Sequence, residues 1–451
     1  MKFFQTVALM LLLTGSIQAQ NFSVLFDFND SGSGGGPVAP LIQGPDGRLY
    51  GTAPGGGSLG GGVVFAINTD GTGYTNFYAF SGDVGSGSQP NGGLLLSGNT
   101  FFGTTAQGAG TGTIFALAAD GSSYTTLHSF STRYGYHPLA TLIMSGSTLY
   151  GTTEYGGPNN FGTLFSFNTT NNYFTNFYNF TNSAIGEYPY AGLVISGDRL
   201  YGTTYQGGSN SWGTVFAVDT DGGNFTNLYN FAYSDGANPY GGLLLVGNRL
   251  YGTTYQGGPG AGNIFAINTD GSGFTNIYNF QDAEDGAYPR AALILNGDTL
   301  YGVASGGGSN SIGSGAIFSV ETNGLNFTNY YTFSSDGTGL NNDGAFPVAN
   351  LLLLTNTLYG VTSQGGTNAQ GTIFSLTLPQ PPQAPTLSVQ ISSGELIITW
   401  PSSATGYSLL SATNLSFSGW SAVTNTPVII DSFYTVTNAT SSGQMFYYLS
   451  Q

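Results

Sequence analysis

The sequence predicts an all-β protein: a seven-bladed β-propeller closed by its N-terminal strand, followed by a small C-terminal β-sandwich. The first observation is a repeat. A Tyr-Gly pair recurs at positions 50, 150, 201, 251, 301 and 359, and Phe102-Gly103 fills the remaining slot, so the steps are 52, 48, 51, 50, 50 and 58 residues. A period of about 50 residues is typical of propeller blades. The second observation is that each strand-like run of the repeat occurs seven times, provided that the N-terminal run is counted.

Each repeat contains four strand-like runs, which are clearest between residues 239 and 281. They cover residues 243–246, 250–254, 263–267 and 274–280, and the turns between them are rich in Gly, Asn and Asp. Such turns favour the positive φ that tight hairpins need. The first run is continuously apolar and the fourth alternates aromatic with polar residues. We therefore expect the first strand to be covered on both faces and the fourth to lie at the outside of the blade.

The two ends of the repeat array predict how it closes. Residues 22–28 resemble a fourth run with no first three before it, and the last repeat has runs at 351–354, 358–361 and 372–376 but no fourth. We expect the N-terminal run to complete the last blade, because closure removes exposed strand edges. Phe22, Val24, Phe26 and Phe28 alternate along this run. Each is expected to bury its side chain against the last blade.

Residues outside the propeller, which is assigned to 21–378, fall into three segments. Residues 1–20 combine Lys2, an apolar run at 7–13 and a small residue at Ala19, which predicts a secretory signal peptide and an extracellular or cell-surface location. Residues 379–385 form a Pro-rich linker. Residues 386–451 show short alternating runs with Trp400 and Trp420, which favour a β-sandwich of immunoglobulin or fibronectin type. No run is long enough to predict a transmembrane segment in the mature chain.

Composition narrows the classes of partner. The formal net charge is −16, and the chain has no cysteine. An acidic surface disfavours nucleic acid and anionic membranes, so neither is expected as a partner. Disulfides and thiolate metal sites are excluded. The oligomeric state is left open, with a monomer favoured.

The repeat motif resembles a known bacterial family. Its pattern is Pro-x-Ala/Gly-x-Leu, then Leu-Tyr-Gly-Thr-Thr-x-x-Gly-Gly, then Gly-Thr-Val/Ile/Leu-Phe, over roughly residues 22 to 378. It is similar to the tandem repeat called GloVer, found in exported "choice-of-anchor" proteins. Departures are Phe101-Phe102 for Leu-Tyr, Val303-Ala304 for Thr-Thr and Ala53-Pro54 in the first copy. The resemblance implies an extracellular, propeller-like array and brings no established catalytic residues.

Candidate binding residues lie in the loops that should share one face of the propeller. These are the loops between second and third strands and the connections from each fourth strand to the next first strand. The candidates for ligand binding, glycan stacking included, are Tyr155, Tyr205, Trp212, Tyr255 and Asp235. Packing between neighbouring loops explains the aromatic residues equally well.

Four acidic residues in these connections are candidate calcium ligands, because calcium is bound by several oxygens from a flexible loop. They are Asp282 and Asp285 in one connection and Asp336 and Asp343 in another. The alternative is that they are solvated loop acids. No other cofactor is indicated.

Three functions remain open from the sequence. The leading hypothesis is a secreted or surface-displayed binding propeller for a glycan or protein ligand. The alternatives are a structural spacer of the cell envelope and a carbohydrate-active enzyme that uses loop carboxylates. An enzyme is not favoured, because neither His128 nor His137 has a spaced partner that suggests a nucleophile–base pair or a metal site.

Overall fold

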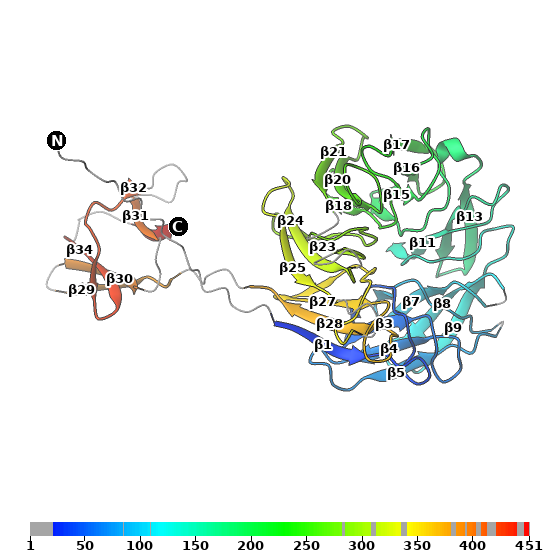
Figure 1. The fold of residues 1–451 in the computed structure, drawn as a ribbon, viewed down its shortest axis with the longest axis horizontal. Helices are drawn as coiled ribbons and strands as arrows, with labels where there is room; N and C mark the ends of the chain where they lie inside the picture. The colour runs from blue at the N-terminus through cyan, green and yellow to red at the C-terminus, as the bar shows by residue number, and fades with distance from the viewer. Residues whose placement is uncertain are drawn as a thin grey trace, which may run out of the picture. The chain divides into compact units, whose positions relative to one another are not determined.

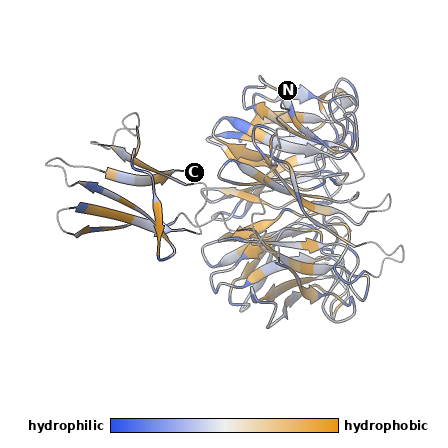
Figure 2. Cartoon of the chain, turned by 60° about the vertical axis from the view of Figure 1, so that its left-hand side comes forward, coloured by the Kyte–Doolittle hydropathy of each residue, from blue (hydrophilic) through white to orange (hydrophobic). Residues whose placement is uncertain are grey.

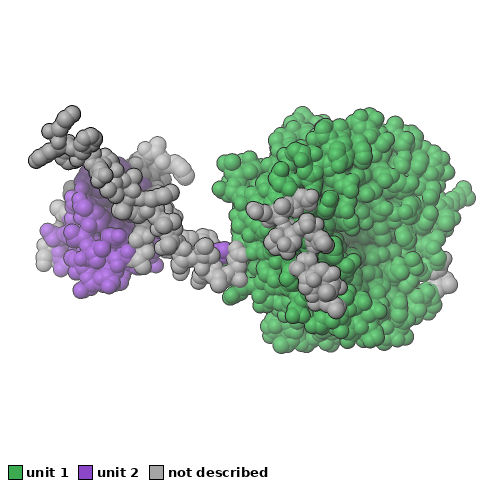
Figure 3. Space-filling view, viewed as in Figure 1, with its two compact units in different colours: residues 1–378 green, residues 379–451 purple. Residues whose placement is uncertain are grey.

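The computed structural model divides the chain into two compact units, residues 1–378 and 379–451 (Figure 3). It describes residues 21–83, 85–108, 110–281, 285–307, 313–334, 341–379, 385–392, 395–402, 407–412, 421–439 and 446–450. The predicted signal peptide at 1–20, and residues 380–384 of the predicted linker, lie outside the described residues. Each unit is described by itself.

The described residues of the first unit form seven four-stranded antiparallel sheets. A single 3-10 helix, η1 (Ser183–Ile185), precedes β14. Six of the sheets are built from consecutive strands: β2 (Ile42–Gln43), β3 (Leu49–Ala53), β4 (Val63–Ile67) and β5 (Thr75–Ala79); β6 (Leu95–Ser97), β7 (Thr100–Thr105), β8 (Thr113–Ala118) and β9 (Tyr124–Ser129); β10 (Ile143–Ser145), β11 (Thr148–Thr153), β12 (Thr163–Asn168) and β13 (Tyr173–Asn179); β14 (Val194–Ser196), β15 (Arg199–Thr204), β16 (Thr214–Asp219) and β17 (Thr226–Asn230); β18 (Leu244–Val246), β19 (Arg249–Thr254), β20 (Asn263–Asn268) and β21 (Thr275–Asn279); β22 (Ile294–Asn296), β23 (Thr299–Ala304), β24 (Ala316–Glu321) and β25 (Thr328–Thr332).

The seventh sheet joins the two ends of the repeat array. Its order is β1 (Asn21–Asp27), β28 (Thr372–Thr377), β27 (Thr357–Thr362) and β26 (Leu352–Leu354). β1 pairs antiparallel with β28 from Asn21 opposite Thr377 to Asp27 opposite Thr372, with a bulge at Leu25. The fourth strand of each of the other six sheets has a bulge at the equivalent place, for example at Ile277 in β21. The N-terminal strand therefore has the pairing geometry of a fourth strand.

The sheets of this unit follow one another around an opening and form a β-propeller-like array (Figure 1). The second and third strands are almost wholly buried, whereas the first strands are short and only half-buried. The expectation that the first strand is covered on both faces was therefore wrong. It borders a channel, whose cavity is lined in part by Ile143 and Val194 of two first strands.

One contact explains the glycine of the Tyr-Gly pair in the motif. A Cβ added to the glycine would lie 2.4–2.7 Å from the tip of the phenylalanine ring on the third strand, as at Gly103 against Phe115 and at Gly202 against Phe216. The seven phenylalanines at this position are 0% exposed. Any side chain in place of the glycine would displace a buried ring, so the repeat keeps a glycine there.

Stacked rings join each sheet to the next. A ring of one fourth strand lies parallel to a ring at or just before the next fourth strand, with centroids 3.7–4.4 Å apart, in seven successive pairs: Phe26–Tyr74, Tyr78–Tyr124, His128–Phe174, Tyr178–Phe225, Tyr229–Phe274, Tyr278–Phe327 and Tyr331–Phe22. The first and last pairs both use β1. His128 replaces the tyrosine or phenylalanine of its pair, and burial lowers the pKa of its imidazole to about 4.

The closing strand is buried differently from the simple alternation that the sequence suggested. Phe28 is 0% exposed, and Phe22 and Phe26 stack on rings of the two adjacent sheets. Val24, however, is 38% exposed, so its predicted burial was wrong. The bulge at Leu25 adds one residue between Val24 and Phe26 and breaks the two-residue period.

The second unit contains two sheets, whose orders are β29-β30-β34-β33 and β32-β31-β35. Its buried core is Ile398, Trp400, Leu409 and Val436, while Trp420 lies outside the described residues. Figure 2 shows the hydrophobic residues concentrated along strands. No helix in the described part of the chain is long and apolar enough to cross a membrane. The strands are β29 (Ser388–Ser392), β30 (Glu395–Pro401), β31 (Ser408–Ala412), β32 (Ser421–Ala422), β33 (Val428–Ile430), β34 (Phe433–Ala439) and β35 (Phe446–Ser450).

Candidate functional site

One unusual backbone conformation recurs in every repeat at one end of the channel. In every repeat the residue before the motif proline has a positive φ of +55° to +62°: Gly36, Gln89, His137, Tyr188, Asn238, Tyr288 and Phe346. Outside glycine this conformation is strained and has to be held by its surroundings. Backbone hydrogen bonds hold it here. The Tyr188 N–H donates to the Phe161 carbonyl at 2.9 Å, and the Tyr188 carbonyl accepts from the Tyr205 N–H at 3.0 Å.

In six of the seven repeats these bonds bring three positions together at the end of the channel, and the first repeat lacks the second bond because Pro54 has no N–H. The three positions are the residue before the proline, the residue after it and the first residue after the Gly-Thr-Thr triplet. We call the residues at the second and third of these positions the channel mouth. After the proline they are Val38, Asn91, Leu139, Tyr190, Tyr240, Arg290 and Val348. After the triplet they are Pro54, Ala106, Glu154, Tyr205, Tyr255, Ser305 and Ser363. The blade motif is nearly constant, whereas these positions carry different chemistry from repeat to repeat.

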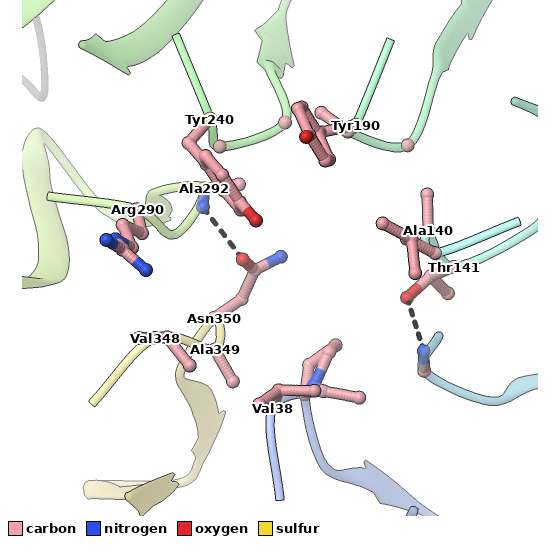
Figure 4. Close-up of a pocket in the computed structure, with 18 of the residues that line it drawn as sticks. Val38, Ala140, Thr141, Tyr190, Tyr240, Arg290, Ala292, Val348, Ala349 and Asn350 are labelled. Atoms are coloured by element: carbon pink, nitrogen blue, oxygen red, sulfur yellow. Dashed lines mark hydrogen bonds between the residues drawn. The ribbon is translucent and has the colours of Figure 1, made fainter. Parts of the chain in front are cut away.

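A cavity of about 290 Å³ lies in the channel and is lined in part by mouth residues, Tyr190, Tyr240 and Arg290 among them. Its other walls include small residues of the Pro-x-Ala/Gly segments and two polar side chains that bridge neighbouring sheets (Figure 4). Asn350 Oδ1 accepts from the Ala292 N–H at 2.7 Å, and Thr141 Oγ1 accepts from the Gly93 N–H at 3.1 Å. These polar groups already have partners, so the open chemistry lies at the mouth.

One arc of the mouth is aromatic. The rings of Tyr190 and Tyr240 are stacked, with centroids 4.8 Å apart and planes 15° apart. Tyr205 stands edge-on to both, at 5.1 Å and 5.6 Å. Tyr255 lies beyond Arg290, with Tyr288 5.2 Å away from it. Three successive repeats thus supply half-buried tyrosines along one arc, with Arg290 between Tyr240 and Tyr255.

Arg290 lies among these rings. Its guanidinium carbon is 4.5 Å from the ring centroid of Tyr255 and 5.3 Å from that of Tyr240, and Figure 4 shows its side chain beside the Tyr240 ring. Its Nε is buried and has no hydrogen-bond partner, and no described carboxylate forms an ion pair with it. Cation–π contacts of this kind hold a guanidinium in place while leaving its N–H groups available.

A buried carboxylate lies at the other end of the arc. Glu154 is 5% exposed; His137 Nδ1 donates to its Oε2 at 3.0 Å, and the Tyr190 hydroxyl donates to its Oε1 at 2.7 Å. Burial acts to raise the pKa of this carboxyl, but the hydrogen bonds from His137, Tyr155 and Tyr190 outweigh it and hold the pKa below its usual value. Glu154 is therefore charged at neutral pH. The pKa of the Tyr155 hydroxyl is raised to about 12, chiefly by the hydrogen bond that it makes to Glu154 and then by its own burial.

The residues predicted as a ligand face divide between two places. Tyr205 and Tyr255 belong to the mouth, and Tyr155 adjoins it through contacts with Tyr136, His137 and Tyr188. The other two candidates have local roles in a connection. The ring of Trp212 packs edge-on against Tyr233 at 5.0 Å. Asp235 accepts hydrogen bonds from the Tyr229 hydroxyl at 2.8 Å and from the Ala232 N–H at 2.9 Å.

The two described calcium candidates repeat the pattern of Asp235. Asp285 accepts from the Tyr278 hydroxyl at 2.7 Å, and Asp343 accepts from the Tyr331 hydroxyl at 2.7 Å and from the Ser334 N–H at 2.8 Å. Asp282 and Asp336, the other member of each predicted pair, lie outside the described residues. Over the described ranges, no group of three or more His, Cys, Asp or Glu residues is close enough to hold a metal ion.

Several residues at or beside the mouth were missed from the sequence: Glu154 and its partner His137, and Tyr190, Tyr240 and Arg290. The missed signal lies in the repeats themselves. The position after each motif proline reads Val, Asn, Leu, Tyr, Tyr, Arg and Val along the chain. A position that varies inside an otherwise constant repeat contributes little to the blade and is a candidate for binding.

Comparison with known proteins supports the repeat and the fold. A family model described as the Gloeobacter/Verrucomicrobia repeat matches residues 14–211 and residues 196–387, which confirms the resemblance drawn from the motif. No curated protein matches the chain. An oligogalacturonate lyase in complex with manganese is similar in structure, with a TM-score of 0.52 and 10% identity over 80% of this chain and 97% of that chain. A putative 6-phosphogluconolactonase from Bacteroides uniformis has a TM-score of 0.45 and 19% identity over 69% and 88%. At such identities, the similarity to the lyase concerns the fold alone.

Proposed function

The chain belongs to the Gloeobacter/Verrucomicrobia repeat family, and we propose that it is a secreted, non-catalytic β-propeller that binds a glycan at its channel mouth. Its frame is a closed seven-bladed ring. The pairing of β1 with β28 and the two ring stacks that β1 forms with the flanking sheets support closure. Secretion rests on the signal-like residues 1–20. Recovery of the mature protein from the cell after fractionation, with its N-terminus at Met1, would contradict it.

The single observation that carries glycan binding is where the repeats differ. Their side chains are nearly constant where they build blades and differ at the mouth, where Tyr190, Tyr205, Tyr240 and Tyr255 gather in one arc. Aromatic rings beside convergent polar groups are typical of small-ligand sites. The apolar face of a sugar ring packs on a tyrosine, while the phenolic hydroxyls and Glu154 are suited to its hydroxyl groups.

The test is binding of the full chain to a glycan array, followed by calorimetry with the best ligand. Tyr240→Ala removes one ring of the stacked pair and is expected to weaken binding by roughly tenfold or more, because an aromatic contact contributes on the order of 1.5 kcal/mol. Tyr173→Ala is the matched control, because Tyr173 is an exposed tyrosine on β13 away from the mouth. Equal loss in both variants, or no binding by the wild type to any glycan, would contradict the proposal.

One observation favours a second candidate, a carbohydrate-active enzyme. Glu154 is a buried carboxylate in contact with an imidazole beside a channel, where it can position a water or a sugar hydroxyl. Its lowered pKa makes it a weak base, and catalysis is therefore the second candidate. The test is depolymerisation of polysaccharides by the wild type and by Glu154→Gln. Turnover that Glu154→Gln abolishes would replace the binding function with catalysis.

A further inference from the structure

The five arginines of the chain, all of them described, have very different surroundings. Four lie away from the mouth: Arg48 donates to backbone carbonyls, Arg199 pairs with Asp219, Arg249 bonds Asn268, and Arg133 is exposed above Tyr134. Arg290 lies at the mouth itself. The chain has six Lys and Arg residues and a net charge of −16, so basic side chains are rare in it. Arg290 lines a cavity and has no ion pair with a described acidic residue, which makes it a candidate for binding an anion.

The environment of Arg290 favours an anion with a planar, two-oxygen head. Its guanidinium carbon lies over the rings of both Tyr240 and Tyr255, which hold the side chain at the mouth. Its Nε is buried without a hydrogen-bond partner, and the side chain lines the cavities at the mouth. A guanidinium held in this way presents parallel N–H groups that match the two oxygens of a carboxylate.

We propose that the mouth recognises an acidic sugar, a uronic acid, whose carboxylate is bound by Arg290 while its ring lies in the channel beside the edge of Tyr240. This assignment rests on the glycan-binding function proposed above and names the class of sugar. The carboxylate of a uronic acid is attached directly to the sugar ring. A ligand beside the edge of Tyr240 can therefore place its carboxylate within reach of a guanidinium 5.3 Å from the centroid of that ring.

The charges around Arg290 favour an isolated carboxylate over a dense polyanion. Glu154, at the far end of the same arc, is held in its charged form and repels a second anionic group. The acidic surface as a whole repels highly charged chains, although salt screens this effect beyond about 8–10 Å. The site therefore suits a sugar with one carboxylate between neutral or hydroxyl-rich neighbours.

The experiment measures calorimetric affinity of the full chain for two probes of the same shape. One is a trimer of glucuronic acid, and the other is the same trimer with its carboxyl groups methyl-esterified. The wild type is expected to bind the acid about tenfold or more tightly than the ester, because a hydrogen bond between charged groups contributes enough free energy for at least a tenfold change in affinity. Arg290→Gln should bind both with the affinity of the ester. Arg133→Gln is the matched control, because Arg133 also lies over a tyrosine ring, at 5.4 Å, but away from the mouth.

The outcomes separate this inference from the function on which it rests. Equal binding of acid and ester by the wild type, or a preference that survives Arg290→Gln, overturns the role of Arg290 while leaving glycan binding standing. Preference for a sulfated trimer, or for a neutral tripeptide with a free carboxyl terminus, overturns the uronic-acid assignment. Absence of binding to both trimers and to every neutral oligosaccharide refutes glycan binding itself. Unchanged thermal melting of Arg290→Gln shows that a lost preference is not a folding defect.

Discussion

Closure of the ring by the N-terminal strand can be tested with one pair of alanine variants. Phe22 on β1 and Phe274 just before β21 occupy equivalent positions in their repeats. Phe22 stacks on Tyr331 and Phe274 stacks on Tyr229, both with centroids 3.7 Å apart and planes 5° apart. The Phe274 stack joins two sheets that are consecutive in the chain. The Phe22 stack joins the two ends of the array, so Phe22→Ala probes closure and Phe274→Ala is its matched control.

The expected loss follows from burial and stacking. Removing a largely buried phenylalanine side chain costs about 1.5–3 kcal/mol in transfer free energy. Losing the aromatic pair adds about 0.5–1.5 kcal/mol. The sum of about 2–4.5 kcal/mol is a large part of the 5–15 kcal/mol that is typical of a domain. With an unfolding entropy of about 2.1 cal/mol/K per residue, a unit of roughly 350 residues shifts by about 1.4 °C per kcal/mol, so Tm should fall by about 3–6 °C.

Thermal unfolding followed by circular dichroism, with size-exclusion chromatography at each step, measures both effects. If β1 closes the ring, the two variants lower Tm by similar amounts. Phe22→Ala should in addition form larger species, because release of β1 exposes the edge of β28. A Tm unchanged by Phe22→Ala but lowered by Phe274→Ala would refute closure and indicate an open array with a loosely attached first strand.

Three further predictions concern pH, calcium and the second unit. His128 is uncharged in the fold, because burial lowers its pKa to about 4, whereas its unfolded value is 6.5. Folding stability should therefore fall as pH drops from 6.5 to 4, and His128→Phe should remove this part of the loss. Parallel curves of Tm against pH for the wild type and His128→Phe would contradict the contribution of His128. Calcium bound by the loops of Asp285 and Asp343 should raise Tm in millimolar calcium relative to chelator, and coincident melting curves would remove the metal site. Deletion of residues 386–451 should leave the melting transition of residues 21–378 unchanged, and a lowered transition would show that the two units depend on each other.

The all-β class and the repeat could be predicted because they follow from local rules. The Gly, Asn and Asp residues of the turns predicted the hairpins, and the period of about 50 residues predicted the repeated four-stranded sheets. The last repeat lacked one run, and β1 supplies it in the structure. Strand alternation failed at Val24 because a bulge is an insertion into the pairing pattern and leaves no mark in the hydrophobic period. The half-buried first strands were missed for a related reason, since apolar runs do not reveal whether they border a channel.

The site could be predicted only in part, because its residues come from several repeats. Glu154 and Tyr190 are separated by 36 residues, and Tyr240 and Arg290 by 50, yet the first pair shares a hydrogen bond and the second a cation–π contact. Aromatic residues in the loops identified Tyr205 and Tyr255. The same criterion also selected Trp212, whose ring packs on Tyr233 in a connection. Composition of a loop does not distinguish a side chain that faces the channel from one that packs locally.

The residues that build the blades differ from those proposed to select a ligand. Blade stability comes from the buried phenylalanines, the Gly–Phe contacts and the ring stacks, none of which uses a residue of the mouth. The mouth is held by backbone hydrogen bonds that any residue with an N–H can make; Ala106, Glu154 and Ser305 all make them. Pro54 has no N–H, and the first repeat lacks this bond while keeping its sheet. Substitutions at the mouth should therefore change what is bound while the blades stay folded. Tyr240→Ala also loses its contacts with Tyr190 and Tyr205, so its thermal melting is measured beside its binding, as for Arg290→Gln.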